Sequence, residues 1–157
     1  MELIKKGSSL YFSVASHDSM SNSRPSALYI LIVIEAVIGL TGLSFGVILF
    51  QDPTGIKTGM NFILPYLPIP DYNLLALWFL TGYGLLPLYI TYALYVAKPF
   101  ARTLALGLAG FEVVWILAQF VFLSEIGMHP MQPLILGQAL LTAFLLTRSS
   151  IVNYLKS

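Results

Sequence analysis

Four long apolar runs dominate the pattern of hydrophobic and polar positions along this chain. They cover about residues 28–50, 74–97, 100–123 and 131–150, and short polar or proline-containing segments separate them. At a rise of 1.5 Å per residue, a helix needs roughly 20 apolar residues to cross the ~30 Å hydrocarbon core of a bilayer. The pattern therefore predicts an all-α fold, a four-transmembrane-helix bundle whose helices run up and down in antiparallel order.

The polar segments outside these runs divide the chain into an N-terminal arm and a transmembrane domain with one long loop. Residues 1–27 are polar and rich in serine, and we expect an N-terminal surface arm there, followed by a transmembrane domain over residues 28–157. Residues 51–73 form the long outer loop. Its stretch 62–70 contains three prolines at spacings that exclude a helix, yet it is too apolar to extend into water, so it should lie in the membrane interface or cap the bundle.

Two details of the helices also follow from the sequence. Pro87 lacks a backbone N–H, which predicts a kink about one turn earlier in the second helix. The fourth apolar run is short, about 25 Å when counted to Thr147. We therefore expect its helix to continue past Arg148 toward Tyr154, with the arginine side chain reaching the membrane surface.

Composition places the chain among integral membrane proteins. Hydrophobic residues make up 57% and charged residues only 10%, where a soluble domain would have about 25% charged residues. The net charge is +1 and the basic residues are scattered, so nucleic acid is not expected as a partner. No cysteine is present, which excludes disulfides and thiolate chemistry. His17 and His129 fall on opposite sides of the predicted membrane, so paired haem ligation is not expected, and no cofactor is predicted.

The distribution of basic residues predicts the orientation. With four spans, the N-terminal arm, the link between the second and third spans and the C-terminus share one side of the membrane. Seven of the eight lysines and arginines lie on that side, and only Lys57 lies on the other. By the positive-inside rule we expect a multi-pass protein of the cell membrane with both termini in the cytoplasm. The seven residues are Lys5, Lys6, Arg24, Lys98, Arg102, Arg148 and Lys156.

Polar side chains inside the spans are the candidate functional residues. Glu35 shares a helix face with Gly39, Gly42 and Gly46, and small residues at that spacing allow another helix to approach closely. Glu112 lies on a face of the third span together with Gln119. Glu35, Glu112 and Gln138 all come out roughly 13–15 Å from the cytoplasmic ends of their helices. The candidate set for binding a ligand or a proton is Glu35, Glu112, Gln119, Gln138 and Thr142.

The free-energy cost of burying a charged carboxylate in the membrane limits the states that Glu35 and Glu112 can adopt. A charged carboxylate at the bilayer centre costs about 2.5–3.5 kcal/mol on insertion scales. Two neighbouring carboxylates cannot both remain charged without a compensating group. The possible states are protonated acids, a proton shared between them, a bound cation, or a basic group from a partner or ligand. We expect Glu35 and Glu112 to face one internal site. A neutral acid with only a structural role remains the alternative.

Polar residues also gather on the predicted outer side. Asp52, Asp71, Glu125 and His129 are candidates there. Glu125 and His129 are four residues apart, but no second histidine lies near and Gly127 with Pro130 disfavours a helix, so no metal site is predicted.

Several short motifs carry a resemblance to a family. They are Asp52-Pro53-Thr54-Gly55, Asp71-Tyr72, Trp115-x-x-x-Gln119 and Gln132-Pro133. With these motifs the chain resembles an uncharacterised family of small four-span prokaryotic integral membrane proteins over roughly residues 28–147. The resemblance implies a four-span topology and assigns no role to any residue.

Two functions are compatible with the sequence. Nucleophile–histidine–acid sets, phosphate loops and His-Glu-x-x-His motifs do not occur, so we expect a non-catalytic accessory or structural subunit of a larger membrane complex, in contact with membrane lipid and other membrane protein subunits. The alternative is a small-molecule- or lipid-binding protein, a carrier or a lipid-active enzyme that uses a buried pocket at Glu35 and Glu112.

Overall fold

Helices form all the regular secondary structure in the part of the chain that the computed structural model describes, residues 24–122 and 131–156. This confirms the all-α prediction. The second apolar run is divided into three consecutive helical pieces, and the C-terminal region into two. The elements are α1 (Ser26–Gln51), η1 (Leu64–Tyr66), α2 (Asn73–Trp78), η2 (Phe79–Leu85), α3 (Leu86–Tyr95), α4 (Ala101–Phe122), α5 (Met131–Thr147) and α6 (Ser149–Tyr154).

In the described part of the chain, three helices are long and apolar enough to cross a membrane. They cover Ser26–Gln51, Asn73–Tyr95 and Ala101–Val121, and a shorter apolar helix covers Gln132–Thr147. Their outward faces carry exposed aliphatic side chains, such as Val33 at 60% exposure. Exposed hydroxyls on the same helices bond to their own backbone, since Ser44 Oγ donates to the Leu40 carbonyl and Thr81 Oγ1 to the Leu77 carbonyl. A surface of this kind suits contact with lipid, where no water is present to satisfy polar groups.

Proline 87 changes the geometry of the second apolar helix. Because Pro87 has no N–H to donate to the Tyr83 carbonyl, the regular α-helical bonding cannot continue through this turn. The preceding residues form the π-helix η2, and the Leu86 N–H donates to the carbonyl of Thr81, five residues earlier. The disruption predicted before Pro87 therefore takes the form of a wider helical turn.

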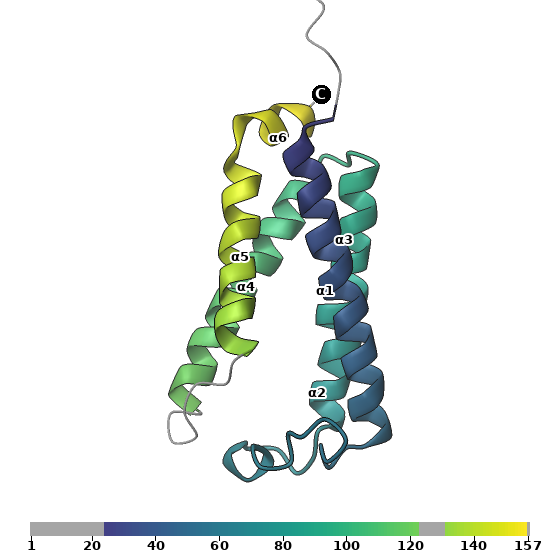
Figure 1. Ribbon diagram of the computed structural model, residues 1–157, viewed down its shortest axis with the longest axis vertical. Helices are drawn as coiled ribbons and strands as arrows, with labels where there is room; N and C mark the ends of the chain where they lie inside the picture. The colour runs from purple at the N-terminus through teal and green to yellow at the C-terminus, as the bar shows by residue number, and fades with distance from the viewer. Residues whose placement is uncertain (1–23, 123–130, 157) are drawn as a thin grey trace, which may run out of the picture.

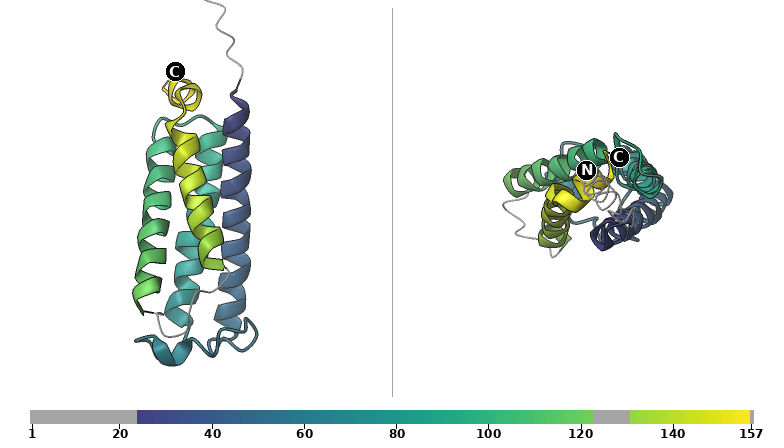
Figure 2. Two further views of the ribbon diagram at one scale, coloured as in Figure 1. Left: turned by 60° about the vertical axis from the view of Figure 1, so that its left-hand side comes forward. Right: turned by 90° about the horizontal axis from the view of Figure 1, so that it is seen from above.

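The helices associate in two groups. α1 packs along α2, η2 and α3, and we call these four elements the α1–α3 group; α4 packs along α5, and we call them the α4–α5 pair. The group and the pair meet through α3 with α4 and α1 with α5. They lie close together at the end where α6 lies and diverge toward the end that carries the 52–72 loop (Figure 1). The view along the helices shows the same grouping (Figure 2, right).

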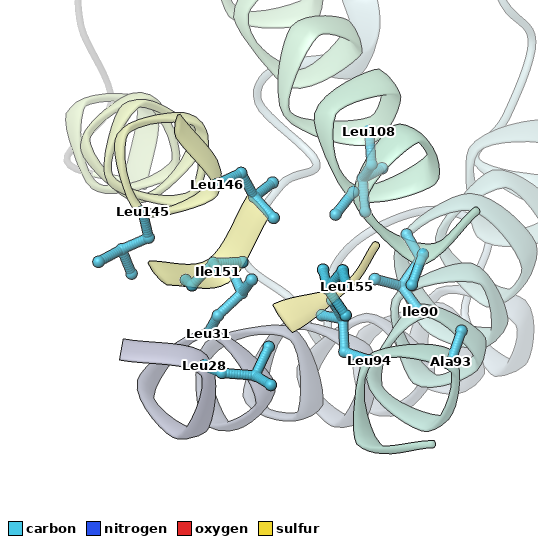
Figure 3. Packing of buried hydrophobic residues seen from close by; sticks show 12 residues of the cluster. Leu28, Leu31, Ile90, Ala93, Leu94, Leu108, Leu145, Leu146, Ile151 and Leu155 are labelled. Atoms are coloured by element: carbon cyan, nitrogen blue, oxygen red, sulfur yellow. The ribbon is translucent and has the colours of Figure 1, made fainter. Parts of the chain in front are cut away.

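A cluster of buried aliphatic residues holds the two groups together at the α6 end, and we call it the terminal-end cluster. It combines Leu28 and Leu31 of α1 with Ile90 of α3, Leu108 of α4 and Leu146 of α5 (Figure 3). Most of these side chains have no exposed surface. Since lipid tails are as apolar as leucine, it is the close packing here that keeps the helices associated.

Separate packing fixes the 52–72 loop on the end of α1 and α2. Tyr72 is fully buried beside Leu49 and Ala76, and its hydroxyl donates a 2.7 Å hydrogen bond to the Met60 carbonyl. The Tyr72 N–H also donates to the Pro53 carbonyl. We call this the loop-end cluster, and neither α4 nor α5 contributes a residue to it. Among the described residues, the loop thus caps the α1–α3 group and makes no cluster with α4 or α5.

The C-terminal region differs from its prediction. We expected the fourth helix to continue through Arg148, but this residue has extended backbone angles (φ −63°, ψ 130°), so the helix ends at Thr147 and a new one begins at Ser149. The new helix α6 lies across the end of the bundle (Figure 1). Its Ile151, together with Leu155, is buried in the terminal-end cluster, and this packing favours the break over a straight extension.

Candidate functional site

Glu35 lies on the packed face of α1. Its side chain is 1% exposed, and Gly39, Gly42 and Gly46 are buried on the same face. This face contacts η2 so closely that a Cβ added to Gly42 would collide with the carbonyl oxygen of Tyr83. The small residues therefore let α1 approach the π-helix, and the approach encloses Glu35.

Glu112 lies on the corresponding face of α4. Its side chain has no exposed surface, and Ala105, Ala109 and Ile116 are buried along the same face. Gln119, one further step along, is half-buried. The periodic burial of this face shows that α4 turns its carboxylate toward the other helices and its valines toward the outside.

The structure brings the two acids together. Glu35 and Glu112 lie within electrostatic range of one another, and the Tyr83 hydroxyl lies within range of Glu112. Five buried polar atoms around this point have no hydrogen-bond partner within the described residues. They are Glu35 Oε2, Glu112 Oε1 and Oε2, the Tyr83 hydroxyl and Trp78 Nε1. We call these four residues the acid centre.

The α5 candidates line the same region. Thr142 is buried, and Gln138, which is half-buried, lies near enough to interact with the Glu112 carboxylate. That contact lacks the geometry of a hydrogen bond, because both Glu112 oxygens stay unpartnered. Gln138 Nε2 lies 3.5 Å from Thr142 Oγ1, its donor–acceptor partner on the same helix. The two α5 residues thus border the acid centre but donate no hydrogen bond to its unpartnered atoms.

Gln119 is separate from the acid centre. It accepts a 3.2 Å hydrogen bond from Nε2 of Gln132, which is buried at the start of α5. This bond joins α4 to α5 on the side of the loop end. Gln132 appeared in the sequence only as part of a motif, and its position facing Gln119 could be found only once the two helices were paired.

An aromatic row beside the acid centre was missed at the level of the sequence. The Trp78 ring contacts Tyr83 edge-on at a centroid distance of 6.2 Å and Phe111 at 4.9 Å, and Phe111 stacks on Trp115 at 6.3 Å. We call Tyr83, Trp78, Phe111 and Trp115 the aromatic row. It crosses from the α1–α3 group to α4, where Phe111 is the residue next to Glu112 in the sequence.

The outer candidates have local roles where they are described. Asp52 accepts hydrogen bonds from the Thr54 hydroxyl, the Thr54 N–H and the Lys57 N–H. These bonds, the Thr54 hydroxyl first, lower the pKa of Asp52 below its ordinary value. Asp71 likewise accepts a 2.9 Å hydrogen bond from the Asn73 N–H at the start of α2. Glu125 and His129 lie outside the described residues.

No known family, curated protein or solved structure matches this chain. The resemblance noted in the sequence therefore adds no role to any residue of the acid centre, and the chemistry has to be argued from the side chains themselves. Among the described residues, no three of the types Asp, Glu, His and Cys come together in a group that could hold a metal ion.

The acid centre costs stability as it stands. Leaving a buried donor or acceptor unpaired costs about 1–3 kcal/mol, and more if the group is charged. The basic residues of the apolar runs are Arg102 and Arg148, each near an end of its run, and the Arg102 Nε donates to the Leu146 carbonyl. Arg102 is ten residues from Glu112, and no lysine, arginine or histidine lies nearer to either acid along the chain, so the helices that carry the acids supply no neighbouring counter-charge. The cost of burying the carboxylate oxygens is offset when a proton, a cation or a hydrogen-bond donor binds to them.

Proposed function

We propose that the chain is a four-span integral membrane protein that binds a small amphiphilic molecule at Glu35 and Glu112. The head group of this molecule donates hydrogen bonds, or positive charge, to the carboxylates and to Tyr83, while its apolar body stays among the helices. The observation that carries the proposal is the set of five unpartnered buried polar atoms of the acid centre, which come from four elements, α1, α2, η2 and α4. Binding, with no catalytic step, is the role that these groups support.

The proposed topology places α1, the α2–α3 helix, α4 and α5 across the bilayer in antiparallel order, with both termini in the cytoplasm. It is supported by the basic residues, seven of eight of which fall on the side that holds the termini. At that end Arg24 donates a 3.1 Å hydrogen bond to the Tyr154 hydroxyl and lies over the Tyr95 ring. Arginine and tyrosine at one level are typical of a membrane interface.

Native mass spectrometry of the protein released from mild detergent tests the proposal. We expect a small-molecule adduct on the wild-type chain, which organic extraction removes. The adduct should fall about tenfold or more in the Glu35→Gln/Glu112→Gln double variant, since the charge that holds the head group is gone. Asp71→Asn, a matched carboxyl-to-amide change in the loop, should leave it unchanged. A wild-type chain without any adduct, or an equal adduct in all three proteins, contradicts the proposal.

The second candidate is the accessory subunit of a larger membrane complex. It is favoured by the same unpartnered acids, because a basic side chain from the helix of another subunit would satisfy them. The experiment above separates the two functions. A second polypeptide that remains bound to the wild type and dissociates from the double variant supports the subunit, whereas a small molecule supports the binding protein.

A further inference from the structure

We propose that the ligand of the acid centre is a lipophilic organic cation, an amine or quaternary ammonium group on an apolar body. This inference rests on the proposed function and names the class of molecule bound. Three observations carry it: the uncompensated acids, the aromatic row beside them, and the fact that, among the described residues, the two helix groups share no hydrophobic cluster on the loop side.

The first observation concerns charge. Glu35 and Glu112 are buried within range of each other, and no basic residue lies within nine positions of either acid in the sequence. A ligand that carries one positive charge relieves the repulsion between two carboxylates, and a neutral ligand does not. A bare metal ion would need several oxygen ligands at short, fixed distances, and the described residues place no group of three metal-binding side chains together.

The second observation concerns the kind of cation. The Trp78 ring lies beside both Tyr83 and Phe111, with Trp115 stacked beyond. Aromatic faces attract cations electrostatically, tryptophan most strongly, and the attraction is largest for weakly hydrated ammonium groups. The Tyr83 hydroxyl, whose oxygen can accept a hydrogen bond from an ammonium N–H, has no partner among the described residues. The row therefore suits an organic ammonium group better than a strongly hydrated inorganic ion.

The third observation concerns the apolar body. On the loop side of Glu112, the described residues of α4 and α5 belong to neither hydrophobic cluster, and the two helix groups diverge there (Figure 1). On the other side the terminal-end cluster packs the groups together, and near Glu112 the Trp78 ring contacts Phe111 of α4. An apolar ligand body that extends toward the loop end would therefore add apolar contacts where the two helix groups share no hydrophobic cluster.

Intrinsic fluorescence offers a direct test, because the two tryptophans of the chain, Trp78 and Trp115, both belong to the aromatic row. The probe is benzyltrimethylammonium, and the control ligand is neopentylbenzene, in which carbon replaces the nitrogen. We expect saturable fluorescence quenching by the cation alone. Its dissociation constant should rise about tenfold or more in Glu112→Gln and stay within a few-fold in Glu112→Asp, which keeps the charge. Asp71→Asn should bind like the wild type.

Three results would overturn the inference. One is equal binding of neopentylbenzene, which would mean that only apolar contacts matter. Another is unchanged cation binding in Glu112→Gln while its helix content and elution in size-exclusion chromatography match the wild type. The last is a neutral amphiphile on the purified protein together with no binding of the cation, in which case the proposed function stands and the ligand class is wrong. If neither an adduct nor a cation binds, both fail.

Discussion

At the scale of single residues, Asp52 shows how a carboxylate can fix a loop without taking part in a site. Its Oδ1 accepts from Thr54 and its Oδ2 accepts a 2.6 Å hydrogen bond from the Lys57 N–H. Because these bonds lower its pKa, Asp52 stabilises the folded loop at pH values above its ordinary 3.8, and this contribution is lost as the pH falls below that value. An asparagine would keep one acceptor oxygen and lose the other.

We therefore predict that Asp52→Asn makes the 52–72 loop more sensitive to limited proteolysis at neutral pH. The cleavage rate measured by mass spectrometry should rise in the variant. With an acid-stable protease, the cleavage rate of the wild type should approach that of the variant below pH 3.8, where Asp52 becomes protonated. The variant has no carboxylate at this position, so its cleavage rate should lack this pH dependence. Equal cleavage of both proteins at neutral pH would show that the turn is held by its other contacts.

The residues of the acid centre were predictable to different degrees. Glu35 and Glu112 stand out in sequence because carboxylates inside apolar runs are rare and costly. Trp78, Tyr83 and Phe111 do not stand out, because aromatic residues make up 13% of the chain and most occur without any polar neighbour. Only the contact between α2 and α4 distinguishes them. The functional role of the acids remains a prediction.

At the scale of elements, the presence of the helices followed from the length of the apolar runs, and their breaks did not. Residues 148–154 contain neither proline nor glycine, so no local signal separates α5 from α6. The break depends on Ile151 and Leu155 reaching the terminal-end cluster, which is a tertiary effect. Pro87 did predict a disruption of the helix, but a missing N–H can be accommodated either by a kink or by a π-helix. The packing of η2 against α1 favours the π-helix, and this packing could not be read from the sequence.

The contact between α1 and η2 gives a prediction for one glycine. In Gly42→Ala the new Cβ would collide with the Tyr83 carbonyl, so α1 has to move away from the π-helix. We expect a loss of about 1–3 kcal/mol in the free energy of unfolding, the usual cost of overpacking. Thermal unfolding in detergent, followed by tryptophan fluorescence, measures it. Gly107→Ala is the matched control, since nothing lies within 4 Å of its added Cβ. Equal destabilisation of both variants would show that the close approach is not required.

At the scale of the whole molecule, the two ends of the bundle differ in chemistry. The α6 end carries Arg24, Arg102 and Arg148 beside exposed tyrosines, and Arg102 Nε donates a 3.0 Å hydrogen bond to the Leu146 carbonyl. The loop end carries Asp52, Asp71 and a single lysine. This asymmetry is the basis of the proposed orientation, because arginine and lysine are retained on the cytoplasmic side during insertion. In that orientation the acid centre would lie between a cytoplasmic half that holds the terminal-end cluster and an outer half that carries the 52–72 loop.

The orientation can be tested cleanly because the chain has no cysteine, so a single introduced thiol is the only site that a maleimide labels. Asn61→Cys places it in the exposed loop and Ser150→Cys in the exposed part of α6. We expect a membrane-impermeant maleimide to label Asn61→Cys in intact cells and Ser150→Cys only after permeabilisation. Labelling of both in intact cells would mean an even number of crossings between them, where the proposed topology has three. Labelling of Ser150→Cys alone would invert the protein and place the loop end, with its side of the acid centre, in the cytoplasm.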